Sequence, residues 1–118
     1  MLNVGVNQTC AVYDIPYGPA TNDPFYRGQM IRAMEEAVTV SNAEGIDLTR
    51  DDLDRAVTLL STLGATLSPS MRQDVLAGRK TEAPLFAGTV LELAAKHGID
   101  TPVNRFYYEK LTELDAKV

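Results

Sequence analysis

The stretch "PFYRGQMIRAMEEAVTVSNAEG", residues 24–45, decides the fold class. Its apolar residues recur every three to four positions, at Ile31, Met34 and Val38 among others, and this spacing places them on one face of an α-helix. Pro24 suits the first turn, where a helix needs no backbone N–H, and Gly45 suits the position after the last turn. We therefore predict a helix from Pro24 to Ala43.

A second helical pattern follows directly. Thr49 can cap a helix whose first turn holds Asp51 and Asp52, because acidic side chains are favourable at a helix N-terminus. The predicted apolar face runs from Leu53 through Val57 and Leu60 as far as Leu63, and Gly64 is the predicted stop.

Two further helices are predicted in the second half of the chain. One runs from about Thr81 to His97, with Phe86, Val90, Leu93 and Ala94 on one apolar stripe, and ends at Gly98. The other begins with Thr101 as its cap and Pro102 as its first helical residue. The predicted buried side of this last helix consists of Val103, Phe106, Leu111 and Leu114.

Residues 1–14, "MLNVGVNQTCAVYD", also have a helical pattern, but no cap or polar lead-in precedes them. We therefore expect the intact protein to continue ahead of Met1. No segment shows the pattern of a strand, so the sequence predicts an all-α fold. Residues 1–118 are expected to form a single helical domain that buries one core and folds on its own.

The composition narrows the functional classes. The chain has 118 residues, 45% of them hydrophobic, and its net charge of -5 argues against a nucleic-acid partner, which usually needs a basic surface. No apolar run is long enough to predict a membrane span, and the N-terminus lacks the positive region of a signal peptide. Cys10 is the single cysteine, so no internal disulfide can form and we expect a reducing, cytoplasmic location. No cluster of His and Cys predicts a metal site, and the spacing of the glycines offers no dinucleotide-binding loop.

Four polar residues could bind a ligand. Asn3 and Asn7 are four residues apart, so they share one helix face and offer amide donors and acceptors to a hydroxylated ligand. Ser70 could donate to a carboxylate, and Glu82 could be an active-site acid. Each has a plainer alternative: the asparagines as surface residues of a frayed terminus, Ser70 as an N-cap, and Glu82 as a first-turn acid that suits the helix dipole.

The joint order of these residues resembles the C-terminal domain of the ketopantoate reductases, also called 2-dehydropantoate 2-reductases. The resemblance lies in "SPSMRQDVLAGRKTE" (residues 68–82), in "LFAGTVLELAAKHGIDTPVNRFYY" (residues 85–108) and in "NVGVNQTCAV" (residues 3–12), so it covers essentially the whole chain. The matching positions are Ser68, Ser70, Met71, Gln73, Asp74, Gly78, Arg79, Thr81, Glu82, Gly88, Gly98, Thr101, Pro102 and Asn104. The sequence departs from the family pattern at Pro69, Ala83, Pro84 and Ala87.

The resemblance implies a two-domain enzyme, with this chain as a helical bundle of the 6-phosphogluconate dehydrogenase C-terminal-like type. An N-terminal Rossmann domain would bind most of NADPH, and a hydride would reduce 2-dehydropantoate to pantoate in pantothenate and coenzyme A biosynthesis. Asn3 and Asn7 would bind the substrate's oxygens, and Ser70 would donate to its carboxylate. Glu82 would act as a catalytic residue near the nicotinamide end of the cofactor, where it keeps a general-acid lysine protonated. The lysine and the Rossmann domain are expected ahead of Met1, so the chain alone is expected to be inactive.

The implied partners are 2-dehydropantoate or a related 2-keto acid, the protein's own Rossmann domain, and a second copy in a homodimer. By analogy alone, the helices between Pro24 and Leu63 could supply that dimer surface. One alternative stays open, namely a free-standing helical dimerisation or interaction module that has no catalytic role.

Overall fold

The structure is a computed structural model that describes residues 3–81 and 87–117, with side chains from Gly5 onward. Its described part is helical and contains no strand, which confirms the all-α prediction. The helices are α1 (Asn3–Tyr13), α2 (Tyr17–Asn22), α3 (Pro24–Ala43), α4 (Arg50–Leu60), α5 (Ser70–Leu76), α6 (Ala87–His97) and α7 (Pro102–Asp115). None of these helices is long and apolar enough to cross a membrane.

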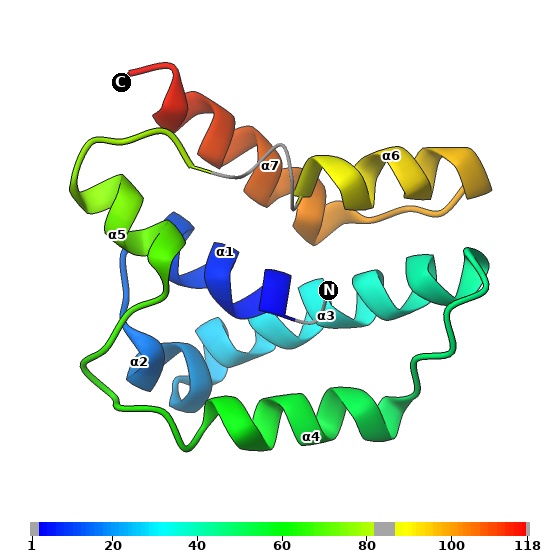
Figure 1. The fold of residues 1–118 in the computed structure, drawn as a ribbon, viewed down its shortest axis with the longest axis horizontal. Coiled ribbons are helices and arrows are strands. Elements are labelled where there is room, and N and C mark those ends of the chain that lie inside the picture. The colour runs from blue at the N-terminus through cyan, green and yellow to red at the C-terminus, as the bar shows by residue number, and fades with distance from the viewer. Residues whose placement is uncertain (1–2, 82–86, 118) are drawn as a thin grey trace.

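The long helix α3 is the centre of the arrangement (Figure 1). It runs across the middle of the molecule, with α4 below it and α6 and α7 above it in this view. It contacts α1, α2, α4, α6 and α7, whereas α5 packs against α1. Segments far apart in the sequence therefore meet around α3 and α1.

Helix α3 has the bounds that the sequence predicts. The Asp23 carboxylate caps it by accepting hydrogen bonds from the backbone N–H groups of Phe25 and Tyr26, and Pro24 occupies the first turn. After its end, Gly45 has a φ of 84°, a left-handed conformation that glycine adopts without steric cost.

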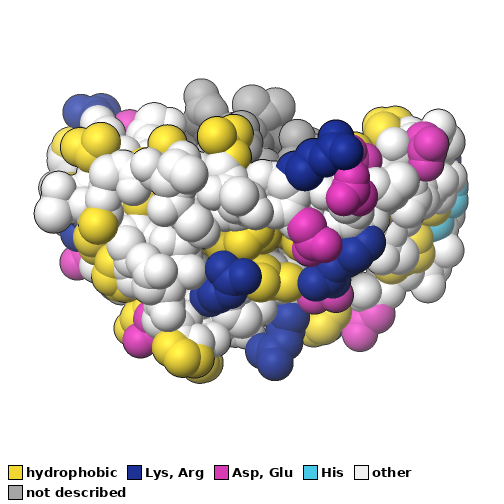
Figure 2. All heavy atoms as spheres, turned by 90° about the horizontal axis from the view of Figure 1, so that it is seen from below, with side chains coloured by type: hydrophobic (Ala, Val, Ile, Leu, Met, Phe, Trp, Pro, Cys, Tyr) yellow, Lys and Arg dark blue, Asp and Glu magenta, His cyan; other side chains and the backbone are white. Residues whose placement is uncertain are grey.

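The outer face of α4 is a charged surface. Arg50 pairs with Glu35 of α3 and with Asp54 one turn along α4, and Arg55 pairs with Asp51. These side chains are half-exposed or more. Figure 2, which views the molecule from this side, shows basic and acidic side chains interspersed with apolar ones.

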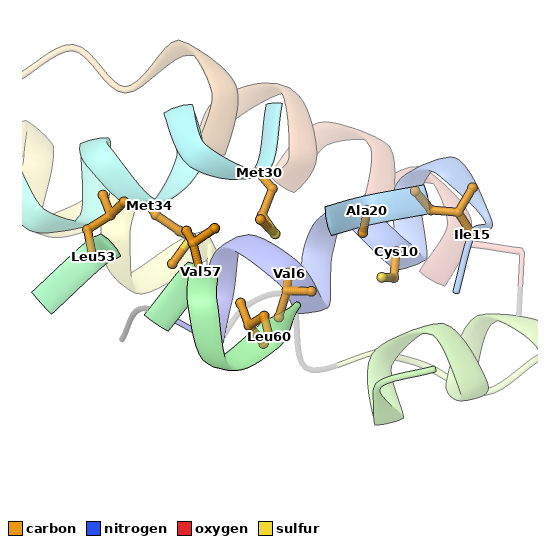
Figure 3. Packing of buried hydrophobic residues seen from close by; sticks show 9 residues of the cluster. All are labelled: Val6, Cys10, Ile15, Ala20, Met30, Met34, Leu53, Val57 and Leu60. Atoms are coloured by element: carbon orange, nitrogen blue, oxygen red, sulfur yellow. The ribbon is translucent and has the colours of Figure 1, made fainter. Parts of the chain in front are cut away.

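The main core lies where α1, α3 and α4 meet (Figure 3). Its buried members are Val6, Cys10, Ile15, Ala20, Met30, Met34, Leu53, Val57 and Leu60. Methionines at the centre suit an irregular space between three helices, because their unbranched side chains adapt to it.

Gly5 allows α1 to approach α3 very closely. A Cβ atom on Gly5 would lie 2.5 Å from Cγ of Met34 and 2.9 Å from the carbonyl oxygen of Met30. Both distances are shorter than van der Waals contact, and one of them is to the backbone of α3. Any larger residue at this position would therefore push the two helices apart.

The predicted end of the second helix is wrong. Helix α4 ends at Leu60, and Leu63 is 40% exposed instead of buried. After Leu60 the α-helix gives way to a turn, in which the N–H of Leu63 bonds to the carbonyl of Leu60 three residues earlier. The N-terminal prediction is confirmed, because Thr49 and Asp52 form a reciprocal capping box.

The predicted start of the third helix at Thr81 is also wrong. Thr81 lies in no helix, because the Asp115 carboxylate at the end of α7 accepts hydrogen bonds from its backbone N–H at 2.8 Å and from its hydroxyl at 3.0 Å. Helix α6 begins at Ala87 and ends at His97, as predicted. Phe86, predicted on the buried stripe of this helix, lies outside the described residues.

Helix α7 departs from the prediction in its cap and its buried face. Thr101 occupies the N-cap position and Pro102 begins the helix, as predicted, but the Thr101 side chain makes no capping bond. Instead the Glu36 carboxylate from α3 accepts from the N–H groups of Val103 and Asn104, both at 2.9 Å. Phe106 is 36% exposed, whereas Tyr107 is completely buried.

The six-residue helix α2 was not predicted, because it is too short to show an apolar period. It is held instead by tertiary contact: the Gly18 N–H donates to the Ala65 carbonyl at 2.9 Å.

Candidate functional site

The contact between α1 and α5 brings two of the predicted site residues to the same part of the molecule. Ala11 of α1, Met71 of α5 and Leu111 of α7 form a small buried cluster. Asn7 lies one turn before Ala11 on the same helix face, and Ser70 directly precedes Met71. The face of α1 that carries Asn7 therefore turns towards the beginning of α5.

Both side chains have unused hydrogen-bonding capacity. Asn7 is half-buried and Ser70 is exposed, and neither side chain hydrogen-bonds to another described residue. Pro69 occupies the N-cap position of α5 without a capping bond, so the alternative that Ser70 serves as an N-cap is wrong. A half-buried amide without a partner is unusual, because polar groups that lose water normally find a hydrogen bond.

The other two predicted site residues cannot be placed. The Asn3 side chain and the whole of Glu82 lie outside the described residues, although the backbone of Asn3 begins α1. Thr81, the residue before Glu82, is fixed to Asp115 of α7 by the two hydrogen bonds given above.

Arg72 links α5 to α1. Its side chain is 18% exposed, so most of this charged residue is buried. Its guanidinium donates to Asp14 Oδ1 at 3.2 Å and to the hydroxyl of Ser68. Asp14 follows the end of α1 with a φ of 54°, a left-handed conformation that aspartate tolerates better than most residues. Arg72 lies two residues after Ser70, and its positive charge is balanced by the Asp14 carboxylate.

The buried weak acids near this contact are poor proton donors or acceptors at neutral pH. Burial raises the pKa of the Cys10 thiol to about 12, although the positive charge of Arg72 opposes part of this rise. Burial also raises the pKa of the Tyr107 hydroxyl, which is hydrogen-bonded to Thr9 at 2.8 Å. Among the described residues, no group of three or more His, Cys, Asp or Glu could hold a metal ion. The groups that this surface offers to a ligand are therefore hydrogen-bond donors and acceptors.

A buried hydrogen-bond network behind α1 was missed by the sequence reasoning. Gln8 Nε2 donates to Asn104 Oδ1 at 3.2 Å. Asn104 Nδ2 in turn donates to the Ala33 carbonyl at 3.1 Å and to Glu36 Oε1 at 2.8 Å. One signal was available, since Gln8 and Thr9 interrupt an otherwise apolar run, but nothing in the sequence indicates their partners.

The comparisons with known proteins agree on one family. Residues 1–115 match the protein family described as "Ketopantoate reductase PanE/ApbA C terminal". The chain is 34% identical over 105 residues to a 2-dehydropantoate 2-reductase of Halobacterium salinarum, and the match covers 89% of this chain and 34% of that protein.

Solved structures show the same arrangement of helices. A dimeric ketopantoate reductase from Staphylococcus aureus superimposes with a TM-score of 0.91 at 22% identity, over 98% of this chain and 40% of that one. A ketopantoate reductase from Ralstonia eutropha JMP134 gives a TM-score of 0.87 at 28% identity, over 98% of this chain and 39% of that one. The chain thus spans about a third to two fifths of the length of these relatives.

Proposed function

The chain belongs to the ketopantoate reductase family, in which it matches the C-terminal part, and from this premise we propose that it is the substrate-binding domain of a 2-dehydropantoate reductase. The complete protein would reduce 2-dehydropantoate, or a related 2-keto acid, to the corresponding 2-hydroxy acid. Residues 1–118 would form one helical domain of this two-domain enzyme.

One observation of the structure carries the proposal furthest. Asn7 holds a half-buried carboxamide without a partner among the described residues, next to the start of α5, where the Ser70 hydroxyl is exposed. An amide and a hydroxyl together supply the donors and acceptors that a small keto acid with a hydroxyl group requires.

The roles of the residues follow from their chemistry. Asn7, together with Asn3 one turn earlier, would hydrogen-bond the hydroxyl and carbonyl oxygens of the substrate and orient its ketone. Ser70 would donate to the substrate carboxylate. Glu82 would keep a general-acid lysine, outside this chain, in its protonated form. NADPH, bound mainly by an N-terminal domain outside this chain, would supply the hydride.

The alternative of a free-standing interaction module is not favoured, because the relatives that the chain matches are reductases. The homodimer and the cytoplasmic location stay predictions. The same holds for the inactivity of the 118-residue chain alone, which NADPH oxidation by that chain with 2-dehydropantoate would contradict.

The experiment that tests the proposal replaces Ser70 by alanine in the full-length protein. Steady-state oxidation of NADPH is followed while the concentration of 2-dehydropantoate is varied. Since Ser70 would bind a carboxylate that is present in both ground and transition states, KM should rise more than kcat falls. The expected loss in kcat/KM corresponds to about 1.5–3 kcal/mol, as for a hydrogen bond to a charged group.

Ser61→Ala is the matched control, because this serine at the end of α4 donates to the Val57 carbonyl, away from the contact between α1 and α5. It should leave both kinetic constants unchanged. An unchanged KM in Ser70→Ala, or a drop in kcat alone, would show that Ser70 has been given the wrong role.

A further inference from the structure

We propose that Glu36, Asn104 and Gln8 form a positioning relay that sets the direction in which the Asn7 side chain points. None of the three would touch the substrate. The inference rests on the proposed function of Asn7 and adds residues from α3 and α7 to those on which substrate binding depends.

The geometry of α1 explains how a hydrogen bond at Gln8 can act on Asn7. Successive residues of an α-helix are about 100° apart around its axis, so Gln8 and Thr9 follow Asn7 by about 100° and 200°. Gly5, on the same side as these two residues, faces α3 at close range. Asn7 therefore lies on the opposite side of α1. Contacts of Gly5, Gln8 and Thr9 with neighbouring helices fix the rotation of α1 about its axis, and this rotation sets the direction of the Asn7 side chain.

Two buried hydrogen bonds fix that side against α7. Gln8 bonds to Asn104, and Thr9 bonds to Tyr107, which lies three residues further along α7 on the same face. All four side chains are completely buried. A rotation of α1 by even one residue's angle would break both bonds and leave several buried polar atoms without partners, which is costly.

The carboxylate of Glu36 sets which end of the Asn104 amide donates and which end accepts, and the order of donors and acceptors along the relay follows from it. The Asn104 amide nitrogen donates to two acceptors, the Ala33 carbonyl and the Glu36 carboxylate. A flipped Asn104 would turn its carbonyl oxygen towards these two acceptors, so this orientation is strongly disfavoured. Asn104 Oδ1 must therefore face α1, and it is the nitrogen end of the Gln8 amide that must face Asn104.

Glu36 also fixes α7 itself. One of its carboxylate oxygens accepts from the Val103 N–H and the other from the Asn104 N–H, in the first turn of α7. A negative charge there is favourable, because the unpaired N–H groups of a helix start carry partial positive charge. One carboxylate on α3 thus holds both the backbone of α7 and the side chain that reaches α1.

The hydrogen bonding of Gln8 allows its proposed positioning role to be tested separately from its contribution to the stability of the protein. Its Oε1 atom is buried and has no hydrogen-bond partner among the described residues, where the side chain makes one bond and leaves one acceptor unpaired. The net stabilisation from such a side chain is small, because the unpaired acceptor offsets the bond. Replacing Gln8 by methionine keeps nearly the same volume and removes the donor together with the unpaired Gln8 acceptor, but it leaves Asn104 Oδ1 unpaired in its place. One unpaired buried acceptor is thus exchanged for another, so we expect little net change in stability.

The test uses the full-length reductase and compares Gln8→Met with Asn7→Ala and with the double variant. Gln8→Met should raise KM for the 2-keto acid about fivefold, the equivalent of one ordinary hydrogen bond, with KM for NADPH and the melting temperature unchanged. Asn7→Ala should raise the same constant at least as much. In the Asn7→Ala background, Gln8→Met should have no further effect, since a positioning residue acts through the residue that it positions.

Gln29→Met is the matched control. This glutamine of α3 donates to the hydroxyl of Tyr13 at 3.0 Å, at the other end of α1, and lies outside the relay. It should leave KM for the keto acid unchanged. Glu36→Gln is a second variant in case Gln8→Met fails to fold. It should raise the same KM, because Val103 and Asn104 donate to different oxygens of Glu36 and glutamine replaces one of these acceptors by an NH₂ group.

The outcomes separate this inference from the proposed function. If Asn7→Ala raises KM while folded Gln8→Met and Glu36→Gln do not, the relay is wrong and the role of Asn7 stands. If the effects of Gln8→Met and Asn7→Ala simply add, Gln8 does not act through Asn7 and the relay is again wrong. If Asn7→Ala itself changes nothing, both the proposed role of Asn7 and the relay are overturned.

Discussion

Helix α3 is held to α1 and α7 in one way and to α4 in another. Towards α1 and α7, the contact depends on a glycine that allows close backbone approach and on buried hydrogen bonds with fixed partners. Towards α4, the contact consists of apolar side chains such as Leu53 and Val57 (Figure 3), and exposed ion pairs such as Arg50–Glu35 also join the two helices. The contact with α1 and α7 therefore depends on exact positions of the packed groups, whereas the contact with α4 depends less on them.

This difference shows where the molecule can tolerate change. An apolar contact loses stability roughly in proportion to the area that is removed, and exposed ion pairs add little. A close-packed contact with buried polar groups fails abruptly, because one lost partner leaves several groups unsatisfied. The proposed substrate-binding side chain Asn7 is carried by α1, on the precise side of α3.

Among the substitutions that test this comparison, Asn104→Ala should lower the free energy of unfolding the most. The change leaves the buried Gln8 Nε2 without its partner and removes one hydrogen bond each from the buried Ala33 carbonyl and from Glu36 Oε1, which keeps its bond to the backbone of residue 104. We expect the free energy of unfolding of the 118-residue chain to fall by about 3 kcal/mol, since each buried group left unpaired costs about 1–3 kcal/mol. Urea denaturation followed by the helical circular dichroism signal measures this.

Two control changes on exposed groups complete that experiment. Asn42→Ala removes an exposed amide that accepts from the Leu48 N–H, and Arg55→Ala removes an exposed ion pair of α4. The second should change the free energy of unfolding by no more than about 0.5 kcal/mol. If Asn104→Ala costs no more than these two, the distinction between the two sides of α3 fails.

Gly5→Ala should have the next largest effect. Alanine normally stabilises a helix by about 1 kcal/mol relative to glycine, but here its methyl group would meet the Met30 carbonyl and the Met34 side chain. We expect a net loss of about 1–3 kcal/mol, the usual range for overpacking. Gly28→Ala in α3 is a matched control, because a Cβ there meets nothing within 4 Å, and it should stabilise the protein. Thermal melts of both variants would show the opposite signs directly; a stabilising Gly5→Ala would contradict the close approach.

The smallest effect is expected at Glu44, which joins the end of α3 to the end of α6. Its carboxylate accepts from His97 at 2.5 Å and from Lys96 at 3.0 Å, and these hydrogen bonds lower the pKa of Glu44 below the ordinary 4.5. A carboxyl group whose pKa is lower in the folded state stabilises the protein above its unfolded pKa, and this contribution disappears as the pH falls through the folded pKa.

The wild-type chain should therefore be more stable than Glu44→Gln at pH 6, and the difference should shrink as the pH falls below 4.5 towards the lowered pKa. Denaturation of both proteins across this pH range measures the difference, in which the titration of the other carboxylates cancels. A difference that is constant with pH, or that grows as the pH falls, would show that Glu44 does not depend on its charge.

The sequence predicted several elements because their signals are local. The bounds of α3 follow from Pro24, from Gly45 and from an apolar period, and the start of α4 follows from a capping box within four residues. Predictions that relied on local signals alone failed where a distant residue intervened. Thr81 looks like a helix start, but Asp115 takes its hydrogen bonds, and Thr101 looks like a cap, but Glu36 does the capping.

The candidate site, too, has features that could be predicted from the sequence and features that only the structure shows. Asn3, Asn7, Ser70 and Glu82 could be named from residue type and from the order of a family pattern, and their roles stay predictions. The structure added that Asn7 is half-buried without a partner among the described residues and that Gln8, its neighbour, is bonded to α7. No pattern in the sequence distinguishes Asn7, which is half-buried, from Gln8, which is completely buried and bonded to Asn104.

By itself, then, the sequence determined the all-α class, the central helix and the membership of a family, because these depend on residue spacing along the chain and on the order of motifs. The tertiary structure alone decided which groups become partners. Gln8 and Asn104 are 96 positions apart, and Glu36 and Asn104 are 68 apart. Hydrogen bonds over such separations exist only after the helices have packed, because packing fixes which side of each helix faces another and whether water remains to compete.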